Sequence, residues 1–114
     1  MEIIKDSIKL EELNKMAKNQ FGDMIKAVVD IEQEIMAIGG GLHADEEVLL
    51  MEEENSRREN TWGINIYPEK AGGEFIEFDS MVNLKPAFGN KSRGVEDSLI
   101  REKIRKIVEK LVSK

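Results

Sequence analysis

The fold class follows from residues 62–84, which read WGINIYPEKAGGEFIEFDSMVNL. Apolar side chains occupy every second position in residues 62–66 and again in residues 76–84, where Ser80 is the one exception. Such alternation is typical of strands that bury one face. Residues 68–73 between the two runs form a glycine-containing loop, and Pro86 ends the second run because proline cannot donate to a ladder. We therefore expect a β-hairpin here.

Another hairpin is predicted upstream of this segment. Residues 24–31 are rich in alternating β-branched side chains, and residues 34–38 form a second short apolar run. The connection through Glu32 and Gln33 is too short for a crossover, so the two runs should pair antiparallel. Gly39-Gly40-Gly41 ends this hairpin.

Three helices are expected around these strands. The first is predicted to start between Ser7 and Leu10 and to end at Gly22. The second should cover residues 43–53 and the third residues 97–112. The third carries the strongest periodic pattern, and we expect Ile104 within it to be buried. In the second, Ala44, Val48 and Met51 share a face, widened by Leu49 and Leu50, that we expect to pack on the core.

These elements predict the order α-β-β-α-β-β-α. Because hairpins rather than βαβ units connect the strands, the class is α+β. We expect a four-stranded antiparallel sheet, built from the two hairpins, with the three helices packed on one face. The length fits a single α+β domain spanning residues 1–114.

Composition excludes several classes of protein. The chain has no cysteine, which excludes disulfides, thiolate nucleophiles and cysteine-based metal sites. Its net charge of −6 argues against non-specific nucleic-acid binding. No apolar run approaches the length of a membrane span, and the first residues do not read as a secretion signal. We expect a cytoplasmic protein with no cofactor, no nucleic-acid partner and no membrane partner.

The charge is unevenly distributed, which leaves room for a local basic site. Residues 1–54 contain 5 basic and 14 acidic residues, whereas residues 55–114 contain 12 and 9. Within the second half, Asn90, Lys91, Ser92 and Arg93 stand between two glycines, just before a predicted helix.

This combination of cations and neutral donors is typical of an anion-binding loop, and these four residues are the anion-binding candidate. The alternatives are a solvated connection, or an internal clamp in which Arg93 pairs with Glu96 or Asp97.

A second candidate lies on the predicted sheet. If the apolar residues of the 62–84 hairpin share one face, Asn65, Glu77 and Asp79 lie together on the other. Two carboxylates in different environments can act as general acid and base. The alternative is the ordinary wet face of an antiparallel sheet. Trp62, which alternates with isoleucines, is expected in the core.

Two other patterns are weaker. Gly39-Gly40-Gly41 precedes a helix as in phosphate-binding loops, but no Lys-Ser or Lys-Thr follows and acidic residues occupy the next turn. His43 and the carboxylates that follow, Asp45, Glu46 and Glu47, offer metal ligands, yet neighbouring helix residues point in different directions. We expect a flexible strand exit and no tight metal site.

Four segments resemble a family of short prokaryotic proteins known as a domain of unknown function. They are Leu42-His43-Ala44-Asp45-Glu46-Glu47, Trp62-Gly63-Ile64-Asn65, residues 75–81 (Phe-Ile-Glu-Phe-Asp-Ser-Met) and Ser92-Arg93-Gly94-Val95-Glu96-Asp97. The resemblance spans most of the chain. It implies no activity, cofactor or catalytic residue.

Two functions from different classes remain open at this point. The first is a non-catalytic binding or regulatory module for another protein or a small anionic ligand. The second is a small hydrolase that uses Glu77, Asp79 and Arg93. They are separated by whether these three side chains converge in one concave pocket.

Overall fold

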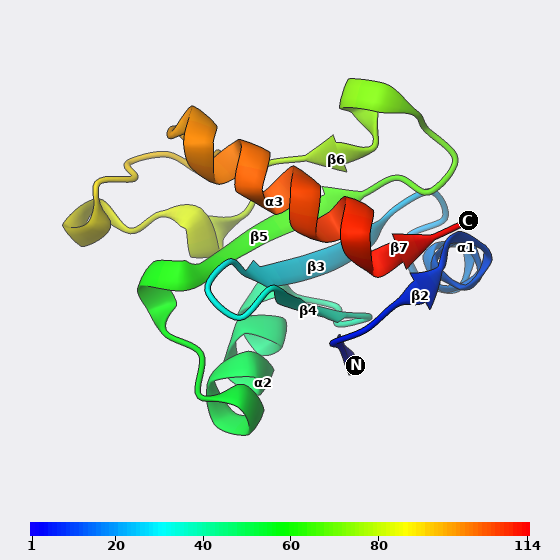
Figure 1. Ribbon diagram of the computed structural model, residues 1–114, viewed down its shortest axis with the longest axis horizontal. Helices are drawn as coiled ribbons and strands as arrows, with labels where there is room; N and C mark the ends of the chain where they lie inside the picture. Colours follow the sequence, from blue (N-terminus) through cyan, green and yellow to red (C-terminus); the bar gives the residue numbers. More distant parts are fainter.

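A five-stranded antiparallel sheet forms the centre of the protein (Figure 1). The structure is a computed structural model that describes residues 1–114. Its spatial order is β1-β4-β3-β5-β6. The strands are β1 (Glu2–Ile4), β3 (Ile25–Asp30), β4 (Ile35–Ile38), β5 (Thr61–Ile66) and β6 (Ile76–Glu77). Both predicted hairpins are confirmed, since β3 pairs with β4 and β5 pairs with β6.

The predicted four-stranded sheet and the order α-β-β-α-β-β-α are wrong. The fifth strand is β1, which pairs antiparallel with β4 and is too short to display an alternating pattern. A second, two-stranded parallel sheet joins β2 (Ile8–Lys9) to β7 (Val112–Ser113). Strands of two residues are too short to show an alternating pattern in the sequence. Their pairing depends instead on contacts with residues distant in the chain.

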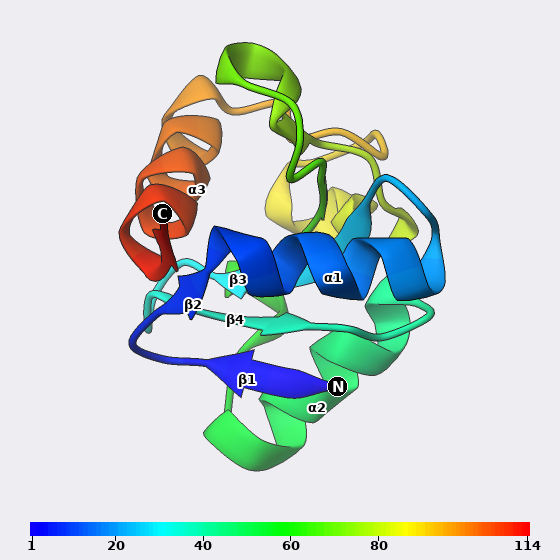
Figure 2. The same ribbon diagram turned by 90° about the vertical axis from the view of Figure 1, so that its right-hand side faces the viewer.

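The helices are α1 (Leu10–Gln20), α2 (His43–Glu54) and α3 (Ser98–Leu111). The expectation that all three pack on one face of the sheet is wrong. The sheet lies between two layers, with α1 and α3 on one side and α2 on the other (Figure 2). The cause is visible in β3, where Ala27 and Val29 join the core beneath α1 and α3 while Val28 is buried on the α2 side. None of the helices is long and apolar enough to cross a membrane.

The main core fills the space between the sheet, α1 and α3. It contains sixteen buried residues, among them Leu13 of α1 and Trp62 of β5. Ile104 has no exposed surface, which confirms its predicted position in the apolar stripe of α3. Asp97 caps that helix, because its side chain accepts a hydrogen bond from the Leu99 amide.

The smaller core beneath α2 explains why the predicted orientation of that helix is wrong. It consists of only four buried residues, Val28, Ile35, Ala37 and Leu50. The rest of the helix face that meets the sheet is polar, with His43, Glu46 and Glu47 all buried. Of the predicted apolar face, Leu50 is buried, whereas Val48 and Met51 are exposed.

The predicted strand over residues 76–84 ends early, at Glu77. The chain then forms a 3-10 turn, η3 (Met81–Asn83), against β5. The Asn83 side chain takes the place of a strand, since its amide accepts from the Gly63 N–H (2.8 Å) and donates to the Gly63 carbonyl (2.9 Å). Gly63 makes this approach possible, because a Cβ atom there would lie 2.5 Å from Ser80 Oγ.

Candidate functional site

The polar residues predicted on the sheet face do come together. Asn65 and Glu77 are register partners on β5 and β6, and the Asn65 amide donates to Glu77 Oε1 at 2.8 Å. The same amide lies 3.4 Å from the Asp79 carbonyl oxygen, and the Tyr67 hydroxyl lies 3.3 Å from Glu77 Oε1. This face therefore carries a connected set of hydrogen bonds rather than separate wet side chains.

Arg93 joins this set through Asp79. Its Nε donates to Asp79 Oδ1 at 2.7 Å, which ties the loop before α3 to the segment that follows β6. The Arg93 backbone is also fixed, because its carbonyl accepts from the Ser80 amide (3.0 Å) and from the Asn83 side chain (2.9 Å). The two terminal nitrogens, Nη1 and Nη2, bind no group of the chain, and the side chain is 55% exposed.

The other three residues of the predicted anion-binding loop are placed differently. The buried Asn90 amide donates to the carbonyls of Asn83, Ser92 and Gly94, so it holds the loop together. Ser92 contributes only its carbonyl to these contacts. The Lys91 amide donates to the chain's own Glu96 carboxylate at 2.7 Å. Of the four candidates, Arg93 and Lys91 keep cationic donors with no acceptor in the chain, Nη1 and Nη2 in Arg93 and Nζ in Lys91. Arg93 differs from Lys91 because its guanidinium is held in place by Asp79.

His43 is the residue that sequence reasoning did not connect to this cluster. It lies at the start of α2, and its Nε2 lies 2.8 Å from the Ile64 carbonyl oxygen. Burial lowers the pKa of His43, although the nearby Asp79 carboxylate opposes that shift. The available signal was that the chain's single histidine falls within the segment 42–47, which resembles the family.

The remaining metal candidates point to separate partners. Asp45 is exposed, Glu46 Oε2 accepts from the Gly40 amide at 3.0 Å, and Glu47 binds Arg58 at 3.1 Å. The structure contains no group of three or more His, Asp or Glu side chains arranged to hold a metal ion. The Gly40 amide, which lies in the predicted strand exit, already faces a carboxyl group of the chain.

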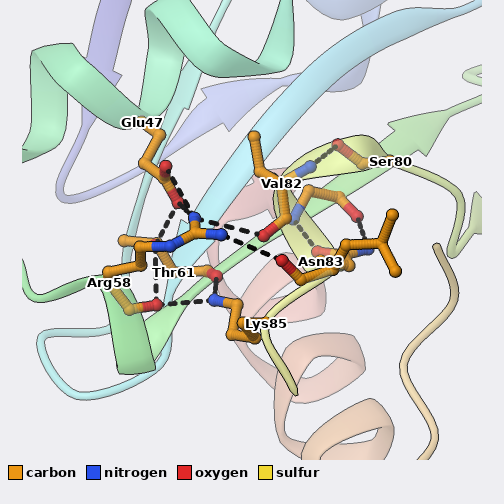
Figure 3. A network of polar contacts seen from close by, with 9 residues as sticks. Glu47, Arg58, Thr61, Ser80, Val82, Asn83 and Lys85 are labelled. Atoms are coloured by element: carbon orange, nitrogen blue, oxygen red, sulfur yellow. Dashed lines mark hydrogen bonds and ion pairs between the residues drawn. The ribbon is translucent and has the colours of Figure 1, made fainter. Parts of the chain in front are cut away.

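A separate polar network holds the segment before Arg93 in place (Figure 3). Glu47 of α2 binds both Arg58 and the Thr61 hydroxyl, and Arg58 donates to the Leu84 carbonyl at 3.0 Å. The buried Lys85 Nζ donates to the carbonyls of Arg58 and Thr61 and lies 4.2 Å above the Trp62 ring. Burial lowers the pKa of Lys85 to about 8. This network anchors α2 and η3 to β5.

The two main hollows of the surface lie away from the cluster. The larger, of about 580 Å³, separates the loop after β5 from the C-terminal half of α3 and is lined by Phe75, Arg105 and Val108 among others. The smaller, of about 410 Å³, is entirely polar and lies around Asp30 and Ser56. Neither hollow is lined by Arg93, Glu77 or Asp79.

Comparison with known proteins adds the family. No curated protein matches the chain, and no solved structure does. One family model matches residues 2–111, and its description is "Protein of unknown function (DUF5674)". That match covers all four segments on which the resemblance was based. The chain therefore belongs to the DUF5674 family.

Proposed function

We propose that this protein is a non-catalytic binding module for a small anionic ligand, with Arg93 as the anchor. The observation that carries the proposal is the side-on pair between Arg93 Nε and Asp79 Oδ1, at 2.7 Å. It uses one nitrogen of the guanidinium and leaves Nη1 and Nη2 together at the exposed end. Two parallel N–H groups match the two oxygens of a carboxylate or phosphate.

The rigidity of this region supports the same conclusion. Ser80 and Asn83 hold the Arg93 carbonyl, and Asp79 orients the side chain. A guanidinium that is already oriented loses less conformational freedom when it binds an anion. Asp79 thus acts as a positioning group for Arg93, and the ligand binds from the solvent side.

The hydrolase alternative receives less support from the same geometry. Glu77 already accepts hydrogen bonds from Asn65 and Tyr67, and Asp79 is paired with Arg93. A pair of carboxylates acts as general acid and base when their environments separate their pKa values. Here both carboxylates are accessible to solvent, and neither lines one of the two main hollows.

Inorganic phosphate provides the test, with thermal unfolding as the readout. At ten times its dissociation constant, a ligand that binds only the folded state stabilises it by about 1.4 kcal/mol, which raises Tm by roughly 5 °C. We expect this rise in the wild-type protein and its loss in Arg93→Ala. The control is Lys103→Ala, which removes an exposed cation of α3 that has no ion pair.

Arg93→Ala should itself change the stability of the free protein by less than about 1 kcal/mol, because exposed ion pairs contribute little. Asp79→Asn should weaken phosphate binding without abolishing it, since the Arg93 fork remains but is less well oriented. A phosphate-induced rise that survives in Arg93→Ala, or no rise in the wild-type protein, would refute the proposal.

A further inference from the structure

An apolar stripe runs along the exposed side of α2. Ala44, Val48 and Met51 follow each other at spacings of four and three residues, which places them on one face of a helix. Val48 is 48% exposed and Met51 is 42% exposed. Leu42, just before the helix, is also exposed. We call the surface formed by Leu42, Ala44, Val48 and Met51 the α2 stripe. Its residue spacing is that of a helix face that packs on a core, yet it faces solvent.

The helix cannot rotate to bury the stripe, because polar contacts fix its other face. His43 binds the Ile64 carbonyl oxygen, Glu46 accepts from the Gly40 amide, and Glu47 binds Arg58. Releasing these groups would leave buried polar atoms unpaired, which costs about 1–3 kcal/mol for each one. The exposure of the stripe is therefore a stable feature of the fold.

The charges on α2 indicate what kind of surface would cover the stripe. The helix contains six acidic residues and no lysine or arginine. Asp45, Glu52 and Glu53 are exposed, and none of them forms an ion pair. Glu54 is the exception, with Lys5 at 2.8 Å. Unpaired carboxylates in the last turn also oppose the helix dipole, so cations supplied from outside would stabilise this end.

We propose that the α2 stripe is the docking surface for a basic amphipathic helix of another protein. The partner's apolar face would cover Val48 and Met51, as one helix packs on another. Its lysines or arginines would lie against Asp45 and Glu52, which flank Val48 on the helix surface. This surface is separate from Arg93, so the proposal does not depend on the anion site.

Two synthetic amphipathic helices with the same leucine stripe provide the test. One carries lysines on its polar face and the other carries glutamates. We expect the lysine peptide to bind, to shift the amide NMR signals of residues 42–54, and to bind more weakly as salt is added. The glutamate peptide should not bind.

Variants separate this surface from general attraction to an acidic protein. Val48→Ser combined with Met51→Ser should weaken the lysine peptide about tenfold or more, which corresponds to about 1.4 kcal/mol. Leu99→Ser is the matched control, because Leu99 is an exposed residue of α3, and it should bind like wild type. Far-UV circular dichroism checks that each variant keeps its helices.

Three results would overturn the proposal. The first is equal binding of the lysine peptide to wild type and to the Val48/Met51 double variant. The second is equal binding of the lysine and glutamate peptides. The third is self-association of the free protein that the double variant abolishes, because the occupant of the stripe would then be a second copy of this chain.

Discussion

Replacing Glu46 by glutamine should stabilise the fold, and the gain should grow as the pH rises. Glu46 has no exposed surface. Its Oε2 accepts from the Gly40 amide, and its Oε1 has no partner. Burial raises the pKa of the Glu46 carboxyl to about 9, against smaller opposing effects of the Gly40 amide and Lys26. The folded protein therefore carries Glu46 protonated at neutral pH.

The sign and size of the effect follow from linkage. The ordinary pKa of this side chain is 4.5, so the unfolded chain releases the proton above that pH while the folded chain keeps it up to about pH 9. Between these values the folded state binds more protons than the unfolded state. The free energy of unfolding thus falls by about 1.4 kcal/mol for each pH unit. A glutamine at this position does not titrate, so the Glu46→Gln variant does not lose this part of its free energy of unfolding as the pH rises.

Urea denaturation of both proteins at pH 5 and pH 8 measures the difference. The free energy of unfolding of Glu46→Gln, minus that of wild type, should increase by about 3–4 kcal/mol between the two pH values. The comparison cancels the contributions of all other titrating groups. A difference that changes by less than about 1 kcal/mol would mean that Glu46 is ionised in the folded protein, and would refute the reasoning.

Three further changes test the packing, each by denaturant unfolding. Ile104→Ala should cost about 2–5 kcal/mol through lost burial and a cavity, and a loss below about 1 kcal/mol would contradict the central place given to α3. Gly63→Ala should cost about 1–3 kcal/mol, because its new methyl group would overlap Ser80; unchanged stability would show that η3 can move away freely. Asn83→Ala should cost at least about 2 kcal/mol, since it unpairs both Gly63 backbone groups and removes one of the two hydrogen bonds to the Arg93 carbonyl. A loss below about 1 kcal/mol would show that water replaces the Asn83 amide.

The sequence could predict the elements whose pattern is long enough to repeat. The hairpins and α3 show clear periodicity, and Ile104 falls where the period places it. The strand β1 and the β2–β7 pair have three and two residues per strand, so their existence depends on contacts distant in sequence. The alternation of apolar residues continues past Glu77, but there the Asn83 side chain takes the place of backbone hydrogen bonds between strands. No local sequence pattern predicts such a side-chain contact.

The same limit applies to α2 and to the site. Hydrophobic pattern places Val48 inward, whereas partners far along the chain, Arg58 and Ile64, fix the helix with its polar face inward. For the site, the alternation of apolar residues predicted that Asn65 and Glu77 share a sheet face, and in the structure they are register partners. The contact between Arg93 and Asp79 depends on an irregular loop, whose path a single sequence does not specify.

The anchoring role of Arg93 is tested most directly by NMR spectroscopy of its guanidinium group during titration with inorganic phosphate. Our account predicts saturable shifts of the Arg93 Nη signals, while the Nε signal keeps the features of a hydrogen bond to Asp79. In Asp79→Asn, the same Nη shifts should require more phosphate. Phosphate that leaves the Arg93 Nη signals unchanged, or that displaces Asp79 from Nε, would contradict the account.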